Sequence, residues 1–385
     1  DLGEAATDTA GGGFTSWEAA LRFLASQARD EALLVVMDEV PYLARSTPGF
    51  ASIVQSVWDH VAIGSHLMLV LTGSAIGTIE DMLGAGGALR GRPTVSMRLD
   101  PVDLLAARTF LPNLEPEQLL EAYAACGGYP IHLNAWDPSA TTATNLLHLA
   151  GTAGGLLVDD AAGILAEELG EADGYRRVLA AIGRGRTRLS DIQTEAGQRI
   201  EHPLEVLRRA GFVLRSLPVG APRKARPIYE LGDVYLAFWF SALYSDLAHV
   251  EGGQGRAVLT RRLPQWERHL AWVFEVEARR HAVRLVASGV LPEDLVVGRW
   301  WASSGEPCEV DVLGLQGTRT RLVGEAIWQS VPLGLKDFRG LMAKASRVPD
   351  PVEDPLFAFW GRRGVDPDVR RAGAWGFDVA DLVRA

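Results

Sequence analysis

Apolar residues in the first 75 positions recur with two different periods. Trp17, Leu21, Leu24 and Ala25 follow helical spacing and predict an amphipathic helix over 17–29. Residues 32–37 and 67–71 are instead unbroken apolar runs, the pattern of strands buried on both faces of a parallel sheet. A helix predicted over 50–63 lies between them, so strand, helix and strand form a βαβ unit.

Both predicted strands end in polar residues. Asp38-Glu39 follows the first strand, and Thr72-Gly73-Ser74 follows the second. Sheets of this kind place their functional sites at the carboxyl ends of the strands, so these residues are the first candidates for chemistry.

The middle of the chain is predicted to be mostly helical. After Leu89-Arg90-Gly91-Arg92-Pro93 come a short strand over 94–99 and a helix from Pro101. Residues 115–168 predict Ala/Leu-rich helices, interrupted by Gly127-Gly128-Tyr129-Pro130.

Residues 175–231 predict three helices followed by a β-hairpin, the order of elements in a winged helix. The helices are expected over 175–182, from Leu189, and over 203–210, and the hairpin strands over 211–215 and 226–231.

An aromatic-rich helix over 233–240 and a polar linker over 251–256 lead to a second α/β domain. Its predicted elements are a helix over 264–283, strands over 309–315, 321–327 and 356–360, and a helix over 335–345 between the last two strands. The chain is therefore predicted to have four parts: 1–112, which contain the βαβ unit; 113–170, which are helical; 171–250, the candidate winged helix; and 257–385, the second α/β domain.

Composition narrows the functional classes. No apolar run is long enough to span a membrane, and the two cysteines, Cys126 and Cys308, form no disulfide framework, so a cytoplasmic protein is expected. The net charge of −10 argues against a chain that coats nucleic acid along its whole length. Residues 176–226, however, contain 12 basic and 4 acidic residues, so a basic module sits within an acidic chain.

Lysine is scarce: of the 38 basic residues, only Lys224, Lys336 and Lys344 are lysines. The first 223 residues therefore contain no P-loop of the form G-x-x-x-x-G-K-[ST], whose lysine reaches the β- and γ-phosphates of a nucleotide.

The strand-end residues nevertheless resemble the hydrolytic part of an ATPase site. An apolar strand ending in Asp38-Glu39 resembles a Walker B motif, in which the aspartate supports Mg²⁺ and the glutamate polarises water. Ser74 matches the polar sensor position on the neighbouring strand, and Arg92 is a candidate arginine finger. The alternative is a strand that meets a solvated loop, with Arg92 an ordinary surface arginine.

The basic module is a candidate DNA-binding surface, because arginines at helix ends and in a wing suit phosphate and groove contacts. The alternative is a protein-binding winged helix whose arginines pair with acidic neighbours. The candidate residues are Arg184, Arg186, Arg188, Arg199, Arg208, Arg209, Arg223, Lys224 and Arg226.

Taken in order, the motifs resemble the archaeal-type ATPases, relatives of AAA+ and STAND NTPases that carry domain of unknown function 234. Nearly the whole chain takes part in this resemblance. It implies that 1–112 are a partial P-loop NTPase core lacking Walker A, 113–170 a helical lid, 171–250 a winged helix and 257–385 a nuclease-like domain. The motifs that carry it are Asp38-Glu39-Val40-Pro41-Tyr42-Leu43, Leu71-Thr72-Gly73-Ser74, Leu89-Arg90-Gly91-Arg92, Gly127-Gly128-Tyr129-Pro130, Tyr229-x-Leu231-x-Asp233, Glu309-Val310-Asp311-Val312 and Gly324-Glu325-Ala326-Ile327-Trp328.

The resemblance implies Mg²⁺ and ATP as cofactors of a complete family member. The family's Walker A motif belongs before residue 1, so the chain resembles an N-terminally truncated member and is expected to bind ATP weakly or not at all. Asp38 would be the residue that supports the metal.

The terminal domain is similar to the PD-(D/E)-x-K nuclease superfamily, in which strand-end carboxylates bind Mg²⁺ and a lysine activates water. Asp311 and Glu325 take the carboxylate positions, with Glu275 as a third. The lysine position is occupied by Ile327, and Lys336 on the next helix is the candidate replacement. The alternative is that the domain is a structural or partner-binding relic.

Three functions follow from these patterns. The first is an ATPase-family protein that couples a nucleotide site to a DNA-binding and nuclease-like module. The second is a non-enzymatic DNA- or protein-binding regulator with a decayed NTPase core, and the third is a Mg²⁺-dependent nuclease. Expected partners are DNA, an effector protein, or further copies of the chain in a homo-oligomer.

Overall fold

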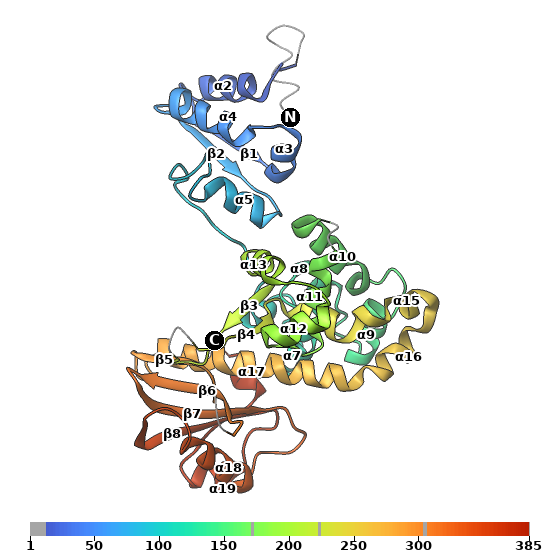
Figure 1. The fold of residues 1–385 in the computed structure, drawn as a ribbon, viewed down its shortest axis with the longest axis vertical. Coiled ribbons are helices and arrows are strands. Elements are labelled where there is room, and N and C mark those ends of the chain that lie inside the picture. The colour runs from blue at the N-terminus through green and yellow to red at the C-terminus, as the bar shows by residue number, and fades with distance from the viewer. Residues whose placement is uncertain (1–12, 171–172, 222–224, 303–305, 385) are drawn as a thin grey trace. The chain divides into compact units, whose positions relative to one another are not determined.

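The structure is a computed structural model that describes residues 13–384, except 171–172, 222–224 and 303–305. The chain forms two compact units (Figure 1). The smaller unit comprises the described residues up to Leu99 together with Ile164–Gly170. The larger unit comprises Asp100–Gly163 and the described residues from 173 on. Arg223 and Lys224, two of the candidate DNA-binding residues, lie outside the described residues.

The smaller unit contains the predicted βαβ arrangement. The strands β1 and β2 pair in parallel, with Leu33 opposite Leu67 and Met37 opposite Leu71. In chain order its elements are α2 (Trp17–Gln27), β1 (Leu33–Met37), α3 (Val40–Ser46), α4 (Phe50–Val57), the π-helical turn η2 (Trp58–Ala62), β2 (Leu67–Leu71) and α5 (Ile76–Leu83).

Helix α2 forms as the apolar spacing predicted. The side chain of Ser16 accepts a hydrogen bond from the Ala19 backbone N–H at 3.1 Å and caps the first turn. Leu21, Leu24 and Ala25 are buried, and Leu21 packs in one core with Phe50 of α4. The helices thus cover one face of the sheet.

The prediction that both faces of these strands are buried is wrong. Leu34, Val36 and Met68 are 61, 57 and 63% exposed. The reason is that the described residues contribute only two strands to this sheet, and their helices pack against the other face. The predicted strand over 94–99 is also wrong: in the described chain it pairs with no strand, and a single extended segment leaves its backbone groups unpaired.

The larger unit begins with helices, as predicted for 115–168. They are α6 (Leu104–Ala107), α7 (Pro116–Cys126), α8 (Pro130–Ala135), α9 (Thr142–Ala150) and α10 (Leu156–Leu169), whose last residues belong to the smaller unit. The interruption between α7 and α8 falls at Gly127-Gly128-Tyr129, as expected.

The three helices and hairpin predicted for the candidate winged helix are also present. They are α11 (Asp173–Gly183), α12 (Leu189–Ala196), α13 (Glu201–Arg209), β3 (Val213–Ser216) and β4 (Ile228–Leu231). The two strands are antiparallel, with Ser216 opposite Ile228. "Candidate winged helix" below means these elements.

The linker predicted over 251–256 is wrong, because that segment is helical on both sides of a kink at Gly253, which has φ 78° and ψ 14°. Gly255 lies so close to the chain after α9 that a Cβ atom there would be 1.7 Å from the Gly151 carbonyl oxygen. Gly255 therefore serves close packing, whereas Gly253 supplies the left-handed backbone of the kink. This region consists of α14 (Val234–Phe238), η3 (Trp239–Leu243), η4 (Tyr244–Asp246), α15 (Leu247–His249), η5 (Val250–Gln254) and α16 (Gly255–Arg261).

The terminal α/β region is a five-stranded sheet with the strand order β5-β6-β7-β8-β9. β6 is antiparallel to both of its neighbours, β5 and β7, whereas β7, β8 and β9 are parallel. Helix α17 runs along one side of the sheet, with α18 and α19 on the other (Figure 1). The elements are α17 (Leu263–Ala287), β5 (Leu295–Trp301), β6 (Glu309–Gln316), β7 (Arg319–Ile327), α18 (Leu335–Ala345), β8 (Pro351–Gly361), α19 (Pro367–Arg371), β9 (Trp375–Phe377) and α20 (Val379–Leu382).

The predicted helices and strands of this region are confirmed, whereas β5 and β9 were not predicted. Phe338 and Leu341 of α18 pack in one core with Val323 of β7 and Phe359 of β8. Within the ranges that the structure describes, no helix has the length and apolar character needed to cross a membrane.

Candidate functional site

The polar residues after β1 and β2 lie together. The Thr72 hydroxyl donates a hydrogen bond to Asp38 Oδ1, which also accepts the Glu39 backbone N–H at 3.0 Å. The Ser74 hydroxyl donates to Glu39 Oε2 at 3.2 Å. Asp38, Glu39 and Ser74 are all exposed, so this edge of the sheet presents two carboxylates and two hydroxyls to solvent.

The backbone holds these side chains in an unusual turn. Glu39 has φ 53° and ψ 43°, in the left-handed region that non-glycine residues rarely adopt. Backbone hydrogen bonds from Val40 N to Thr72 O and from Thr72 N to Met37 O, both 2.9 Å, fix the turn to the end of β2. Such conformations persist where surrounding bonds over-determine them, and they cluster at functional sites.

Sequence reasoning did not select Thr72 as a site residue. The signal was its position: Met37 lies opposite Leu71, so the next residues on the two strands, Asp38 and Thr72, are neighbours at the sheet edge. A hydroxyl directly after the second strand is therefore as informative as the serine two residues later.

Arg92 is engaged within its own unit. Its guanidinium binds Asp59 through Nε to Oδ1 at 2.9 Å and Nη2 to Oδ2 at 2.7 Å. The hydrogen bond with Arg92 lowers the pKa of Asp59, and the same bond raises the pKa of Arg92. A bidentate pair of this kind fixes the side chain, so an arginine-finger role would require the pair to open.

The carboxylates predicted in the terminal region also come together. Glu275 lies on α17, Asp311 on β6 and Glu325 on β7. Burial, and then the negative charge of Asp311, raises the pKa of Glu275 to about 8 and that of Glu325 to about 7. Burial raises the pKa of Asp311 as well, although its Oδ2 accepts the Ala326 backbone N–H at 3.0 Å. The three residues form one partly desolvated acidic cluster.

A lysine does reach this cluster, but it is Lys344 and not Lys336. The Lys344 ammonium lies 2.7 Å from Glu325 Oε1. Lys336 is exposed and makes no ion pair with any described residue. Both lysines are on α18, whose buried positions include Phe338, Leu341 and Ala345. At 100° per residue Lys344 flanks that buried face and Lys336 lies opposite it, so helical periodicity was the signal that separated them.

The residues present do not form a metal site by themselves. Among the described side chains, no group of three or more His, Cys, Asp and Glu residues is arranged to hold a metal ion. At the terminal cluster Glu325 is neutralised by Lys344, and Asp311 is bound to backbone. In this conformation the carboxylate oxygens that would bind a metal are thus already engaged by protein groups.

The candidate DNA-binding arginines fall into two groups. Arg184 and Arg186 both pair with Glu195, at 3.1 and 2.8 Å, and Arg208 pairs with Glu205. Arg188, Arg199 and Arg226 make no ion pair with a described carboxylate, and Arg209 has an interaction of its own.

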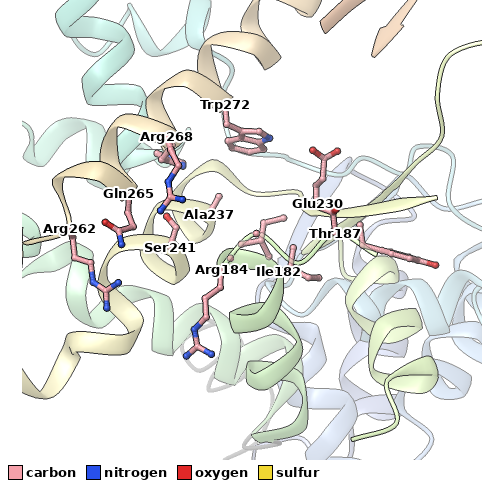
Figure 2. Close-up of a pocket in the computed structure, with 15 residues that line it drawn as sticks. Ile182, Arg184, Thr187, Glu230, Ala237, Ser241, Arg262, Gln265, Arg268 and Trp272 are labelled. Carbon is pink, nitrogen blue, oxygen red and sulfur yellow. The ribbon is translucent and has the colours of Figure 1, made fainter. Parts of the chain in front are cut away.

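Arg184 also lines a pocket of about 350 Å³ in the larger unit. Figure 2 shows that Gln265, Arg268 and Trp272 approach this pocket from α17, while Arg184 extends away from them. The pocket thus borders the candidate winged helix, and Glu230 and Thr187 also line it.

Comparisons with known proteins agree with part of the sequence resemblance. Residues 239–339 match the DUF234 family, described as archaea bacterial proteins of unknown function. An uncharacterized protein of Methanocaldococcus jannaschii is 25% identical over 365 residues, covering 90% of this chain and 78% of the relative. A second uncharacterized protein of that organism is 32% identical over 54 residues, covering 14% of this chain and 52% of the relative.

Among solved structures, a Walker-type ATPase of Pyrococcus abyssi matches with a TM-score of 0.43 and 18% identity, covering 62% of this chain and 74% of that one. The DUF234 match confirms the C-terminal part of the resemblance.

Proposed function

We propose that the strand-end residues of the smaller unit are the hydrolytic half of an ATP site. We further propose that the larger unit binds DNA, and that ATP binding and hydrolysis at the site control this binding. In this proposal Asp38 supports Mg²⁺, Glu39 orients the attacking water and Ser74 contacts the γ-phosphate. The phosphate-cradling half is not supplied by these 385 residues, whose first 223 contain no lysine. In this proposal another segment or another chain supplies it.

One observation carries this proposal. The pairs Thr72–Asp38 and Ser74–Glu39 link the ends of two adjacent parallel strands, so both acidic side chains are held by hydroxyls from the next strand. A strand that simply meets a solvated loop would not require these cross-strand hydrogen bonds. It would also not require Glu39 to adopt the strained left-handed backbone conformation.

ATP hydrolysis by the protein expressed from its complete reading frame tests the proposal. Glu39→Gln keeps the size and hydrogen-bonding capacity of the side chain but removes the charge that polarises water. We expect turnover to fall at least about 100-fold, with Mg-ATP binding retained. Steady-state phosphate release and calorimetry measure the two quantities.

The matched control is Arg45→Ala. Arg45 is an exposed residue of α3 that is not among the strand-end residues, so its replacement should leave turnover unchanged. Equal turnover in wild type and Glu39→Gln would contradict the proposed role. Micromolar binding of Mg-ATP by the 385-residue chain would contradict the division of the site into two halves.

The DNA-binding part of the proposal is supported by the charge of the candidate winged helix. Arg188, Arg199 and Arg226 keep their charge free of ion pairs within the described chain, and guanidinium groups suit phosphate contacts. A homo-oligomer, in which Arg92 leaves Asp59 to act at a neighbouring subunit, belongs to the same proposal.

A metal-dependent nuclease is the second candidate function. One observation favours it: Lys344 lies beside Glu325 in the acidic cluster, where the sequence alone offered only Ile327. The order of elements from α17 to β8 (helix, three strands, helix, strand) also supports a nuclease-like domain. The engagement of Glu325 by Lys344 and of Asp311 by backbone counts against a formed metal site among the described residues.

Plasmid nicking in Mg²⁺ or Mn²⁺ decides whether the cluster is active. A nuclease requires that Lys344→Ala and Asp311→Ala each reduce nicking at least about 100-fold, because the activating cation or the metal-binding carboxylate is lost. Lys336→Ala removes the same charge from the same helix and should have no effect. Undetectable nicking by the wild-type chain, or nicking that survives Lys344→Ala, would eliminate this candidate.

A further inference from the structure

A second pocket, of about 450 Å³, lies between the candidate winged helix and the terminal sheet. Both borders belong to the larger unit. Four of its lining side chains are basic, namely Arg188, Arg299, Lys344 and Arg347, whereas Glu309 is the acidic one. The pocket therefore joins the candidate winged helix to residues from Arg299 onward and concentrates positive charge between them.

Two of these four cations are already neutralised. Arg299 is ion-paired with Glu230, at 2.8 Å, and with Glu309. Lys344 is paired with Glu325. These ion pairs hold the Arg299 and Lys344 side chains in place at the pocket and neutralise most of their positive charge.

The other two cations remain available to a ligand. Arg188 makes no ion pair with a described carboxylate, and among the described residues its guanidinium donates one hydrogen bond, to the Arg226 carbonyl at 3.4 Å. The Arg347 guanidinium donates to the backbone carbonyls of Glu306, at 2.6 Å, and Pro307, at 3.4 Å, which orient it without neutralising its charge. Its nearest described carboxylate partner is Glu306, at 3.8 Å, a side chain that is 89% exposed. An ion pair of that length and exposure holds its charge weakly.

Trp301 gives an independent indication of a ligand. It lines the same pocket, is 7% exposed, and its indole N–H is buried without an acceptor among the described residues. Buried donors in folded proteins are almost always paired, so an unpaired one needs an explanation. An oxygen atom of a bound anion would accept this hydrogen bond.

We propose that this pocket binds a backbone phosphate of DNA, held by Arg188, Arg347 and the Trp301 N–H. A phosphodiester carries one negative charge and two non-bridging oxygens, which match two planar guanidinium groups and one neutral donor. Such a contact positions DNA without reading its sequence. The inference rests on the proposal that the larger unit binds DNA, and it places the backbone against both the candidate winged helix and the terminal sheet.

Fluorescence anisotropy with a labelled DNA duplex tests the two arginines. Arg188→Ala and Arg347→Ala should each weaken binding about tenfold and reduce the slope of log affinity against log salt by about one. The Arg188 side chain makes no capping bond to α12, so its removal should not unfold the unit. Arg339→Ala, an exposed arginine of α18 that does not line the pocket, is the matched control and should bind like the wild type.

The outcomes separate this inference from the function on which it rests. If the wild type binds DNA and the two pocket variants bind equally well with the same salt slope, the pocket assignment is wrong while DNA binding stands. If the wild type binds no DNA at low salt, both are wrong.

The indole resonance of Trp301 gives a second, local readout. Its signal in the ¹⁵N–¹H spectrum is assigned with Trp301→Phe, and inorganic phosphate and the duplex are then added separately. A downfield shift of this N–H with the duplex supports the inference, because the proton gains an acceptor. A shift with inorganic phosphate alone identifies a free-phosphate site and overturns the assignment to DNA, as does a Trp301 signal that stays fixed while other indole signals move.

Discussion

Replacing Gly128 by alanine is expected to destabilise the larger unit by at least about 3 kcal/mol, because a Cβ atom there has no room. It would lie 1.9 Å from the carbonyl oxygen of Val102 and 2.5 Å from its backbone nitrogen. The Val102 N–H also donates to the Gly128 carbonyl at 2.9 Å. Because backbone and not a rotatable side chain blocks the position, the strain cannot be relieved by a rotamer change. Urea unfolding followed by tryptophan fluorescence measures the loss.

Gly340→Ala is the matched control for this substitution. Gly340 lies within α18, and a Cβ atom there would meet no other part of the described chain within 4 Å, so alanine should stabilise the helix by about 1 kcal/mol. A Gly128→Ala protein as stable as the wild type would show that the chain between Pro101 and Val102 moves freely, and the packing argument would fail.

This packing gives a physical reason for one of the motifs that carry the family resemblance. Gly127 has φ 60° and lies against Tyr235, and Gly128 lies against Val102. The Tyr129 hydroxyl donates to Asp233 at 2.8 Å. The Gly-Gly-Tyr-Pro motif and the Tyr-x-Leu-x-Asp motif therefore lie in contact. Their residues pack α7, α8 and α14 together, which is a structural role.

The sequence predicted those elements whose own periodicity decides their structure. α2 and α18 have buried stripes at helical spacing, and β6, β7 and β8 are apolar runs in a sheet covered on both sides. The predictions from sequence were wrong where the burial or pairing of a segment depends on the elements beside it. The strand predicted over 94–99 lacks a partner strand in the described chain, and one face of β1 and β2 lacks cover, neither of which is visible in the segment itself.

The positions of the candidate site residues divide in the same way. The grouping of Asp38, Glu39 and Ser74 at one edge of the sheet could be predicted, because strand register alone brings the ends of β1 and β2 together. The pairing of Arg92 with Asp59 could not be predicted, because it joins a loop to η2 through side chains 33 residues apart. Lys344 was missed because position along the chain favoured the lysine nearer to Glu325, whereas the face of α18 selects the farther one.

Acid is expected to weaken the larger unit through a buried histidine. His269 is 5% exposed, and its Nε2–H donates to the Ala124 carbonyl at 2.8 Å. Burial lowers the pKa of His269 to about 4, against 6.5 for the free side chain, although the bond to Ala124 acts in the opposite direction. Above pH 6.5 both the folded and unfolded states hold the neutral ring, and the histidine has no effect on stability. As the pH falls below 6.5 the unfolded state takes up the proton first, so the free energy of unfolding drops, by about 3 kcal/mol once pH 4 is reached.

A variant series isolates this contribution from that of other titrating groups. His269→Gln keeps a donor for the Ala124 carbonyl but cannot take up a proton, so its free energy of unfolding should fall less steeply between pH 6.5 and pH 4 than that of the wild type. The difference should grow to about 3 kcal/mol at the acid end. His202→Gln, at an exposed position of α13 in the same unit, should follow the wild-type curve. Parallel curves for wild type and His269→Gln would mean that the ring is protonated in the folded state, and that the α7–α17 contact around it opens to admit water before the unit unfolds.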